Sequence, residues 1–372
     1  MGITLETLRP CLSFDGNGYV EVSTAVKNII NKNSQYTIEF FARATVSGRV
    51  HQLFQYGYTS TDRHGLTFDS SGRPTFNYYD GTWKAVKGNV VPWGEFAHIA
   101  VVFNTYNDIK IYVNTRLGSP GDRTYTYPYT NITIARDSYY NKDGLIGEIA
   151  YVRIYNRLLS EGEIQHNYNN PDNPIRNGLA LWFKVNEGSG NILYDASGNN
   201  NNGLATNASW TTFWRNETSR LIQFRHSLTS RELEKIEFTL IHTDLDIGQR
   251  VRAKRDGNIF FEGIIYERRK RHDQNYMSVE ATAYTDLILF DRHVVYRLYE
   301  AGTRAGDIIR DLASLEQGVN VDEVDDGPQL LTNWEIQNQT ALEVMKSVAR
   351  GTNYWLRMRP GKRLVFRPKA MF

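Results

Sequence analysis

The stretch that decides the fold lies between residues 144 and 203 and contains two motifs. Residues 144–164 read GLIGEIAYVRIYNRLLSEGEI, and residues 186–203 read NEGSGNILYDASGNNNNG. Within the first motif, residues 147–155 have the composition and pattern of a strong β-strand. The second motif is dense in Asn and Gly, which accept left-handed backbone angles, so it indicates turns between strands.

Upstream of this stretch, short alternating segments are separated by turn residues. Residues 36–42 alternate strongly between apolar and polar side chains, and segments 73–79 and 83–86 flank an Asp-Gly turn at 80–81. Alternation around Asp-Gly turns is typical of antiparallel hairpins with one solvated face. About a dozen such strands without a long helix predict a mainly β sandwich.

Four segments of this region occur in an order that resembles laminin G-like, concanavalin A-like jelly rolls. They read FDGNGYVEV, WGEFAHIAVVFN, DIKIYVNTRLG and IGEIAYVRIYNRLLSEGEI. The resemblance implies a sandwich that holds carbohydrate or protein ligands and only sometimes cleaves them, closed by a helical turn at 158–164. In that family the NEGSGN type of segment tends to open the domain, whereas here it follows the closing strand.

The end of the first domain is marked by residues 169–178, which read NNPDNPIRNG and look like a linker because they break both periodicities. A good strand follows at 179–185. We therefore expect a circularly permuted sandwich over residues 1–214, in which residues 179–214 complete the sheets. The alternatives are a truncated second copy, which is too short to bury a core alone, and donation of the strand to a neighbouring subunit.

The pattern changes after residue 215. A small antiparallel barrel or sheet with an Asp256-Gly257 turn is expected first, then two helices, the second opened by a capping box at Thr340 to Glu343, and finally a hairpin. The expected strands are 236–240, 247–253, 259–266 and 276–283; the first helix is 304–315, the second ends at 351, and the hairpin strands are 354–358 and 363–366.

This order resembles the hub and tail proteins of tailed phages and related contractile injection machines. The segments that carry the resemblance are IGQRVRAKRDGNIFFEGIIYE, AGTRAGDIIRDLASL and TALEVMKSVARGTNYWLRMRPGKRLVF. The resemblance implies an α+β domain over residues 215–372 that forms rings, commonly trimers, near the tail tip. The implied partners are further copies of the chain and other tail proteins, in a virion assembled in the host cytoplasm.

Charge is balanced along the chain. Residues 1–214 carry 18 basic and 18 acidic side chains of the 43 and 41 in total, so neither domain has the positive field of a typical nucleic-acid binder. The run Arg268 to Arg271 is bordered by Glu267 and Asp273, which favours a solvated hairpin end or a salt-bridge surface over a specific nucleic-acid contact.

Two further properties of the sequence narrow the classes of protein. Cys11 is the only cysteine, which excludes internal disulfides and zinc sites built on paired cysteines. The chain has no run of about 18 apolar residues and no apolar signal peptide. We therefore expect neither membrane insertion nor secretion by the usual signal.

Aromatic residues are the candidates for carbohydrate binding, because sugars present hydroxyls and flat C–H faces that aromatic rings and neighbouring amides can contact. Adjacent residues of a strand point to opposite faces, so half of each aromatic cluster is expected to be buried. The candidates, for which a cell-surface polysaccharide is the expected ligand, are Tyr56, Tyr58, Tyr79, Trp83, Tyr139 and Tyr140.

The second motif also contains candidate ligands for Ca²⁺, since hard cations prefer oxygen ligands. They are Asp195, Ser197, Asn199 and Asn201. The alternative is a plain Asn/Gly turn. Residues 149–152 read Ile-Ala-Tyr-Val where many relatives of the resembled family carry Ile-Asp-Glu-Val, and the missing acidic pair counts against a metal site.

Catalytic motifs are absent from the sequence: there is no Gly-x-Ser-x-Gly, no His-Glu-x-x-His and no alternating carboxylate series. Glu21 and Glu39 are isolated, and His98 on an apolar strand is interpreted as a packed residue. We therefore predict a non-enzymatic virion structural protein of a phage tail tip or baseplate, with a lectin-like domain for host attachment or decoration. The alternatives are a tail glycan depolymerase with carboxylates on different strands and a structural tail adaptor without a ligand.

Overall fold

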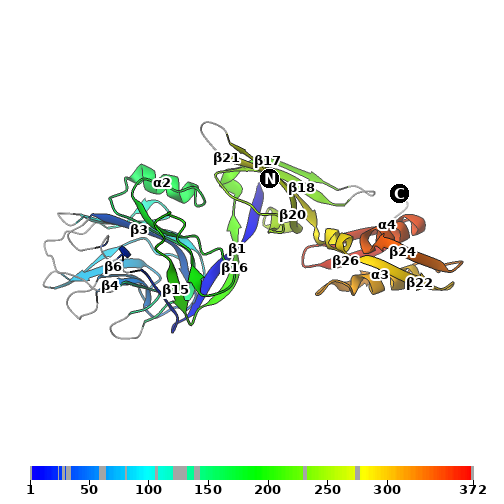
Figure 1. Ribbon diagram of the computed structural model, residues 1–372, viewed down its shortest axis with the longest axis horizontal. Coiled ribbons are helices and arrows are strands. Elements are labelled where there is room, and N and C mark those ends of the chain that lie inside the picture. Colours follow the sequence, from blue (N-terminus) through cyan, green and yellow to red (C-terminus); the bar gives the residue numbers. More distant parts are fainter. Residues whose placement is uncertain are drawn as a thin grey trace. The chain divides into compact units, whose positions relative to one another are not determined.

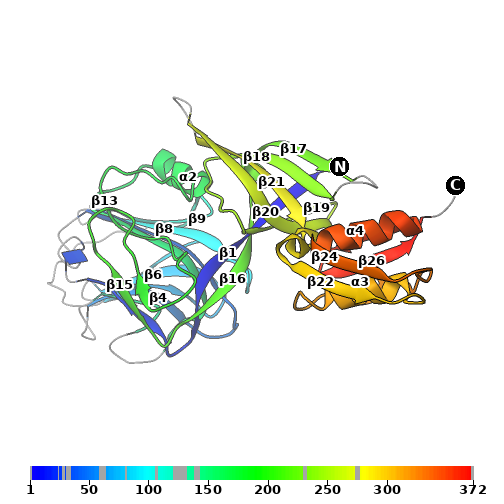
Figure 2. The same ribbon diagram turned by 45° about the vertical axis from the view of Figure 1, so that its right-hand side comes forward.

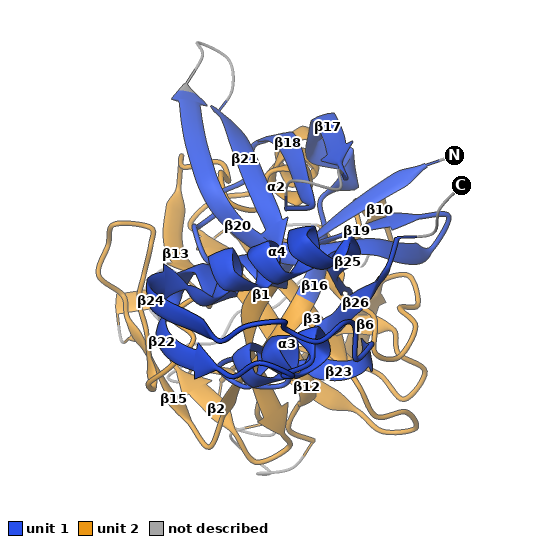
Figure 3. Ribbon diagram, turned by 90° about the vertical axis from the view of Figure 1, so that its right-hand side faces the viewer, with its two compact units in different colours: residues 1–8, 214–372 blue, residues 9–213 orange. Residues whose placement is uncertain are grey.

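The computed structural model divides into two compact units, which Figure 3 distinguishes by colour. We call residues 9–213 the sandwich unit, and residues 1–8 with 214–372 the C-terminal unit. The structure describes residues 2–23, 25–26, 30, 35–57, 64–79, 82–104, 108–119, 132–137, 143–228, 233–272 and 277–369.

The sandwich unit consists of two antiparallel sheets (Figure 1). The first has the order β10 (Arg116–Leu117), β9 (Ile109–Val113), β8 (Ala97–Phe103), β3 (Tyr36–Ala44), β12 (Ile146–Tyr155) and β1 (Ile3–Asp15), with β13 (Leu179–Phe183) also paired to β12. The second has the order β14 (Ile192–Leu193), β15 (Gly203–Thr206), β2 (Tyr19–Glu21), β11 (Ile132–Ile134), β4 (His51–Tyr56), β5 (His64–Phe68), β6 (Pro74–Tyr79) and β7 (Trp83–Lys87).

Alternation along the strands builds the core between these sheets. On β8, Ile99, Val101 and Phe103 lie in the main apolar cluster, whereas Ala100 and Val102 belong to a second cluster on the other face of the sheet. This two-faced pattern follows from the period of two along a strand. The predicted mainly β sandwich is confirmed.

Residues 179–206 contribute strands to both sheets of their own chain. In the first sheet, β13 pairs with β12, and in the second, β15 pairs with β2. Gly203 permits the second contact, because a Cβ at this position would lie 2.7 Å from the Phe183 ring. The closing strand at 179–183 is therefore used within the chain rather than donated to a neighbour.

Helix α2 (Glu161–Asn169) and the segment after it cover the outer face of the first sheet. The capping box of Ser160 and Glu163 begins the helix, and hydrogen bonds from Arg157 lower the pKa of Glu163 to about 2. The segment 169–178, which the sequence suggests is a linker, is packed instead: Tyr155 Oη donates to the Ile175 carbonyl at 3.1 Å.

A buried charge cluster lies beneath α2. Glu39, His98 and Arg153 have side chains with no exposed surface. Arg153 Nη1 lies 3.1 Å from Glu39 Oε2, and His98 Nε2 lies 3.4 Å from Glu39 Oε1. Asn167 Nδ2 donates to both carboxylate oxygens, at 3.1 and 3.0 Å, and Arg153 also donates to the Pro171 carbonyl.

This cluster corrects one sequence interpretation and supports another. Glu39 is not isolated, since its pairing partner across β3 and β12 is Arg153. Burial by itself would raise the pKa of Glu39, but the hydrogen bond and charge of His98 and the charge of Arg153 lower it below its ordinary value. His98 is a packed residue, as expected. Because all three side chains are closed to solvent, the cluster holds strands and helix together and cannot meet a ligand.

The C-terminal unit begins with an antiparallel sheet that extends from β1. The order onward from β1 is β19 (Arg250–Arg255), β20 (Asn258–His272), β21 (Met277–Thr285), β18 (Lys235–Ile241) and β17 (Leu221–Ser227). Positive φ angles at Asp256 and Gly257 form the predicted hairpin turn. In the described part of the chain β17 pairs with β18 and not with β1, so the sheet is open, and the predicted barrel is wrong.

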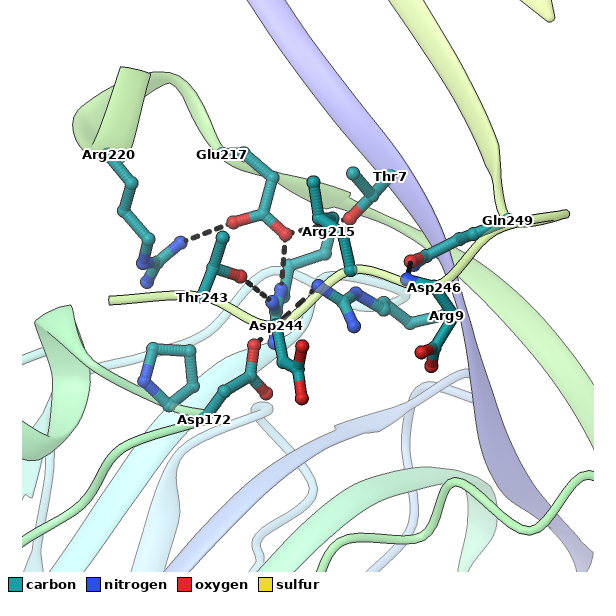
Figure 4. A network of polar contacts seen from close by, with 12 residues as sticks. Thr7, Arg9, Asp172, Arg215, Glu217, Arg220, Thr243, Asp244, Asp246 and Gln249 are labelled. Carbon is teal, nitrogen blue, oxygen red and sulfur yellow. Dashed lines mark hydrogen bonds and ion pairs between the residues drawn. The ribbon is translucent and has the colours of Figure 1, made fainter. Parts of the chain in front are cut away.

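Glu217 explains why residues 1–8 belong to the C-terminal unit rather than to the expected 1–214 domain (Figure 4). Its buried carboxylate accepts hydrogen bonds from Thr7 Oγ1 and Arg215 Nε at 2.7 Å each and from Arg220 Nη1 at 3.0 Å. Its backbone N–H donates to the Leu5 carbonyl at 2.8 Å. The start of β1 is thus bonded to the turn η1 (Thr218–Arg220) and to β16 (Ser209–Asn216), a strand that also pairs with β1.

The rest of the C-terminal unit is an α+β arrangement in which α4 packs against α3, β24 and β25 (Figure 2). Both predicted helices, the capping box and the final hairpin are confirmed. The elements are η2 (Asp286–Arg292), β22 (Val294–Tyr299), α3 (Ala305–Ala313), β23 (Asn320–Val324), β24 (Trp334–Thr340), α4 (Ala341–Thr352), β25 (Tyr354–Arg359) and β26 (Arg363–Pro368).

Arg153→Met is expected to lower the free energy of unfolding by about 3–5 kcal/mol, because it leaves the Glu39 carboxylate buried without its charge partner. Lys110→Met is the matched control, since Lys110 forms an ion pair with Asp108 but is 40% exposed, and it should change the free energy by less than about 1 kcal/mol. Urea denaturation measures both. Equal losses in the two variants would contradict a supporting role for the cluster.

Candidate functional site

A hollow of about 180 Å³ lies on strands β4 to β7 in the second sheet of the sandwich unit. Its polar lining follows from strand alternation: Thr67 stands between the core residues Leu66 and Phe68, and Asn77 follows the core residue Phe76. The residues that line the hollow are Val50, Gln52, Gln55, His64, Gly65, Thr67, Asn77, Trp83, Asp137 and Asp143.

The Gln52 amide has a fixed orientation. The side chain is 6% exposed, and its Nε2 donates to the carbonyl oxygens of Phe54 at 2.5 Å and Leu66 at 3.4 Å. A flipped amide would place oxygen against these carbonyls, so the nitrogen must face them and Oε1 must point elsewhere. Gly65 makes room, because a Cβ there would lie 2.5 Å from Gln52 Nε2.

The Asn77 amide is oriented by a short hydrogen-bond chain. Asn77 Nδ2 donates to Thr67 Oγ1 at 3.1 Å, and that hydroxyl donates to the Thr75 carbonyl at 3.3 Å. Since the hydroxyl hydrogen of Thr67 is committed to Thr75, its oxygen must act as the acceptor toward Asn77. Asn77 Oδ1 is therefore left for other partners.

Two carboxylates and an exposed indole complete the lining. Asp137 is 5% exposed, whereas Trp83 is 47% exposed. Asp143 is tied to β4 through its carbonyl, which accepts a hydrogen bond from the Gln52 N–H at 2.7 Å. Trp83 and Tyr79 are cross-strand partners with their rings edge to face, 5.6 Å between centroids. The hollow thus joins hydrogen-bonding groups to an aromatic face.

The predicted aromatic candidates have different outcomes. Trp83 lines the hollow, and the ring of Tyr79 contacts the ring of Trp83. Tyr56 is 1% exposed and lies in the core, where burial raises its pKa to about 12, so it does not offer a ring to a sugar. Tyr58, Tyr139 and Tyr140 lie outside the described residues.

Sequence reasoning did not find the polar half of the hollow. Gln52, Asn77, Asp137 and Asp143 come from separate segments and form no linear motif. The one available signal was alternation, which places polar residues between core residues on β5 and β6. Their convergence depends on pairing between strands, which a single sequence does not specify.

The four candidate Ca²⁺ ligands do come together in one loop. Asp195 Oδ1 accepts the backbone N–H groups of Trp182 and Ser197, and its Oδ2 accepts the Ser197 hydroxyl and the Asn201 N–H, at 2.8 to 2.9 Å. The side-chain amides of Asn199 and Asn201 donate to the Ala180 carbonyl at 3.2 and 3.0 Å. These hydrogen bonds close the loop by themselves.

The donor set of this loop fits a hydrogen-bonded turn better than a metal site. Asp195 is the only carboxylate among the four candidates, and both of its oxygens are occupied by donors. Within the described residues there is no group of three or more His, Cys, Asp or Glu side chains arranged to hold a metal ion. The calcium site stays a prediction.

A second hollow, of about 680 Å³, lies on β17, β18, β20 and β21 of the C-terminal unit. Its lining carries both charge signs, including Arg225 and Glu237, whose charged atoms are 3.6 Å apart. The basic run nearby is also paired: Arg268 lies 2.9 Å from Asp246, and Lys270 lies 2.6 Å from Asp244. Positive and negative side chains are therefore paired on this surface, and neither sign of charge dominates it.

Residues 14–165 match the family model described as the Concanavalin A-like lectin/glucanases superfamily. The sandwich unit has a concanavalin A-like fold. Residues 223–366 match a second model, described as YQBQ-like. No curated protein matches the chain. In the described residues we find no helix with the length and apolar character needed to span a membrane.

Several solved structures are similar to parts of the chain. A candidate carbohydrate-binding protein from Bacteroides ovatus is 17% identical, with 56% of this chain and 61% of that chain covered and a TM-score of 0.45. The IT-sialidase CBM40 of Ruminococcus gnavus is 15% identical over 43% and 96%, with a TM-score of 0.37. A 43 kDa tail protein of prophage MuSo2 from Shewanella oneidensis is 10% identical over 43% and 53%, with a TM-score of 0.35. The chain thus spans about three fifths of the Bacteroides protein.

Asp195→Ala is expected to lower the free energy of unfolding by about 2 kcal/mol or more, because it leaves three backbone N–H groups without their acceptor. Ser189→Ala, an exposed position of the same segment, is the control and should have little effect. Thermal melts in CaCl2 and in EDTA test the calcium prediction on the same variants. A rise of Tm with Ca²⁺ that Asp195→Ala abolishes would support the site, and equal midpoints would contradict it.

Proposed function

We propose that the chain is a non-enzymatic structural protein of a virion tail whose concanavalin A-like unit binds a cell-surface carbohydrate in the hollow on β4 to β7. The observation that carries the binding role is the combination of oriented amides with the exposed Trp83 ring. A sugar offers hydroxyls to the amides and a C–H face to the indole. The hollow is smaller than the roughly 300–1,000 Å³ of drug-sized ligand pockets, so it suits a single sugar unit of a longer polymer.

A depolymerase is the second candidate function, since Asp137 and Asp143 both line the hollow. Glycosidases use two carboxylates that flank the scissile bond, one of them as the acid. We favour binding because hydrogen bonds fix the side-chain amides of Gln52 and Asn77 so that their oxygens can accept hydrogen bonds from sugar hydroxyls. Release of reducing ends from host polysaccharide, abolished in Asp143→Asn, would establish cleavage instead.

The tail location is supported by the sequence resemblance of residues 247–366 to hub and tail proteins, and by an apolar surface in the C-terminal unit. Val294, Tyr296 and Leu298 alternate along β22 and are 54%, 64% and 61% exposed. Large exposed apolar side chains that share one strand face mark interaction sites. We assign this face to contact with another copy of the chain.

Trp83→Ala is expected to weaken binding of host polysaccharide by about tenfold, which corresponds to about 1.4 kcal/mol, through loss of the aromatic face. Tyr194→Ala is the matched control, since Tyr194 is 60% exposed in the same unit and does not line the hollow. Calorimetry on purified polysaccharide measures both. Equal affinities in the two variants would show that the carbohydrate does not bind at Trp83. If the unaltered chain binds no polysaccharide, the structural adaptor is favoured.

The double variant Tyr296→Ser/Leu298→Ser is expected to reduce the light-scattering mass from an oligomer, commonly a trimer, to a monomer, because apolar burial drives association. Ile222→Ser changes another exposed apolar residue of the C-terminal unit, 54% exposed on β17, and should leave the mass unchanged. A chain that is already monomeric at high concentration would refute self-assembly through β22.

A further inference from the structure

Two amides in the lining of the hollow on β4 to β7 present hydrogen-bond acceptors to it. Gln52 Oε1 receives no hydrogen bond from the described residues, although its side chain is 94% buried, and Asn77 Oδ1 likewise receives none. Both amide nitrogens are used inside the sheet, so what each amide presents to the hollow is its oxygen. An acceptor that opens to the hollow without a protein partner is satisfied by a donor from a ligand or water.

The charged side chains of the described lining are acidic and stand beside the titratable His64. Asp137 and Asp143 are carboxylates, which accept hydrogen bonds and donate none when ionised. None of the described lining residues is Lys or Arg. Within the described lining, a ligand carrying a carboxylate or phosphate would therefore meet like charge and find no Lys or Arg.

The exposed indole of Trp83 adds a third property. An aromatic face attracts a cation through its quadrupole, and Trp is the best of the aromatic side chains in this respect. Trp83 lines the same hollow as the two carboxylates. An ammonium group carries three hydrogen-bond donors and no acceptor. It can therefore donate to the amide oxygens and the carboxylates while its charge interacts with the indole. A neutral hydroxyl is both donor and acceptor, so its acceptor finds no use among these groups.

We propose that the hollow selects a sugar with a free ammonium group, that is, a hexosamine that is not N-acetylated. The inference rests on the proposed carbohydrate-binding function and names the ligand class of that site. The side-chain oxygens of Gln52, Asn77 and Asp143 receive the ammonium hydrogens, and Trp83 covers the sugar beside them. Gly65 contributes to this selection, because the absence of a side chain there leaves space for the Gln52 amide nitrogen within the sheet, so that the amide oxygen faces the hollow.

The test compares two probes that differ only at the nitrogen: a glucosamine oligosaccharide with free amines and the same oligosaccharide fully N-acetylated. Calorimetry with the full chain at physiological salt, at a mildly acidic pH where the sugar amines are protonated, is expected to show about tenfold tighter binding of the free-amine probe, a preference that charge-assisted hydrogen bonds and cation–π attraction can supply. An oligouronate of equal length serves as the anionic probe and should bind most weakly.

Two variants then assign the preference to the hollow. Asp143→Asn removes one charge with little change of shape and should lower the preference to less than about threefold. Asp108→Asn is the matched control, since Asp108 is an exposed acid of the same unit outside the hollow, and it should retain the full preference. Quenching of tryptophan fluorescence by the two probes, lost in Trp83→Ala, gives a second readout on the unaltered chain.

The outcomes separate this inference from the function on which it rests. Equal binding of both probes, or tighter binding of the N-acetylated probe or the uronate, with dependence on Trp83 would overturn the ammonium preference and leave carbohydrate binding intact. No binding of any oligosaccharide or host polysaccharide would overturn both. An equal preference in the Asp143→Asn and Asp108→Asn variants would also overturn the inference, because the carboxylate would then play no part in selection.

Discussion

The sandwich unit depends on the buried pair of Glu39 and Arg153. Each charge is fully removed from water, so the pair depends on hydrogen bonds that offset the lost hydration. Those bonds come from α2 through Asn167 and from the segment after it through the Pro171 carbonyl. The pair therefore ties two strands, a helix and a segment that resembles a linker in sequence into one packed layer. The candidate site lies on the second sheet, away from this layer.

The sequence predicts strands better than it predicts what they bring together. Alternation located the strand that begins at Tyr36, and turn chemistry located Asp256 and Gly257, because both are local properties. Glu39 looked isolated because its partner is more than one hundred residues away, and only the register of β3 against β12 joins them. The expected barrel failed for the same reason. Whether β17 meets β1 or stops at β18 is decided by long-range pairing and not by either strand.

The candidate site shows the same division between local and distant information. Trp83 and Tyr79 were predictable, since a hairpin brings them together across a short turn. Tyr56 was not excluded by its sequence, because alternation divides a strand into two faces without stating which face is inward. The oriented amides lay beyond prediction altogether. The direction of the Gln52 amide depends on the carbonyls of Phe54 and Leu66, and on a glycine in the neighbouring strand that leaves space for it.

Charged side chains are also arranged differently in the two units. In the C-terminal unit, the basic run is neutralised locally, since Arg268 and Lys270 face Asp246 and Asp244 at ion-pair distance. Charges paired in this way release few counterions to a polyanion, so they give little affinity for nucleic acid. In the hollow of the sandwich unit, the described lining contains Asp137 and Asp143 beside His64, and no Lys or Arg. A near-neutral chain can therefore still bring acidic side chains close together, and their position arises from the fold of a few segments rather than from composition.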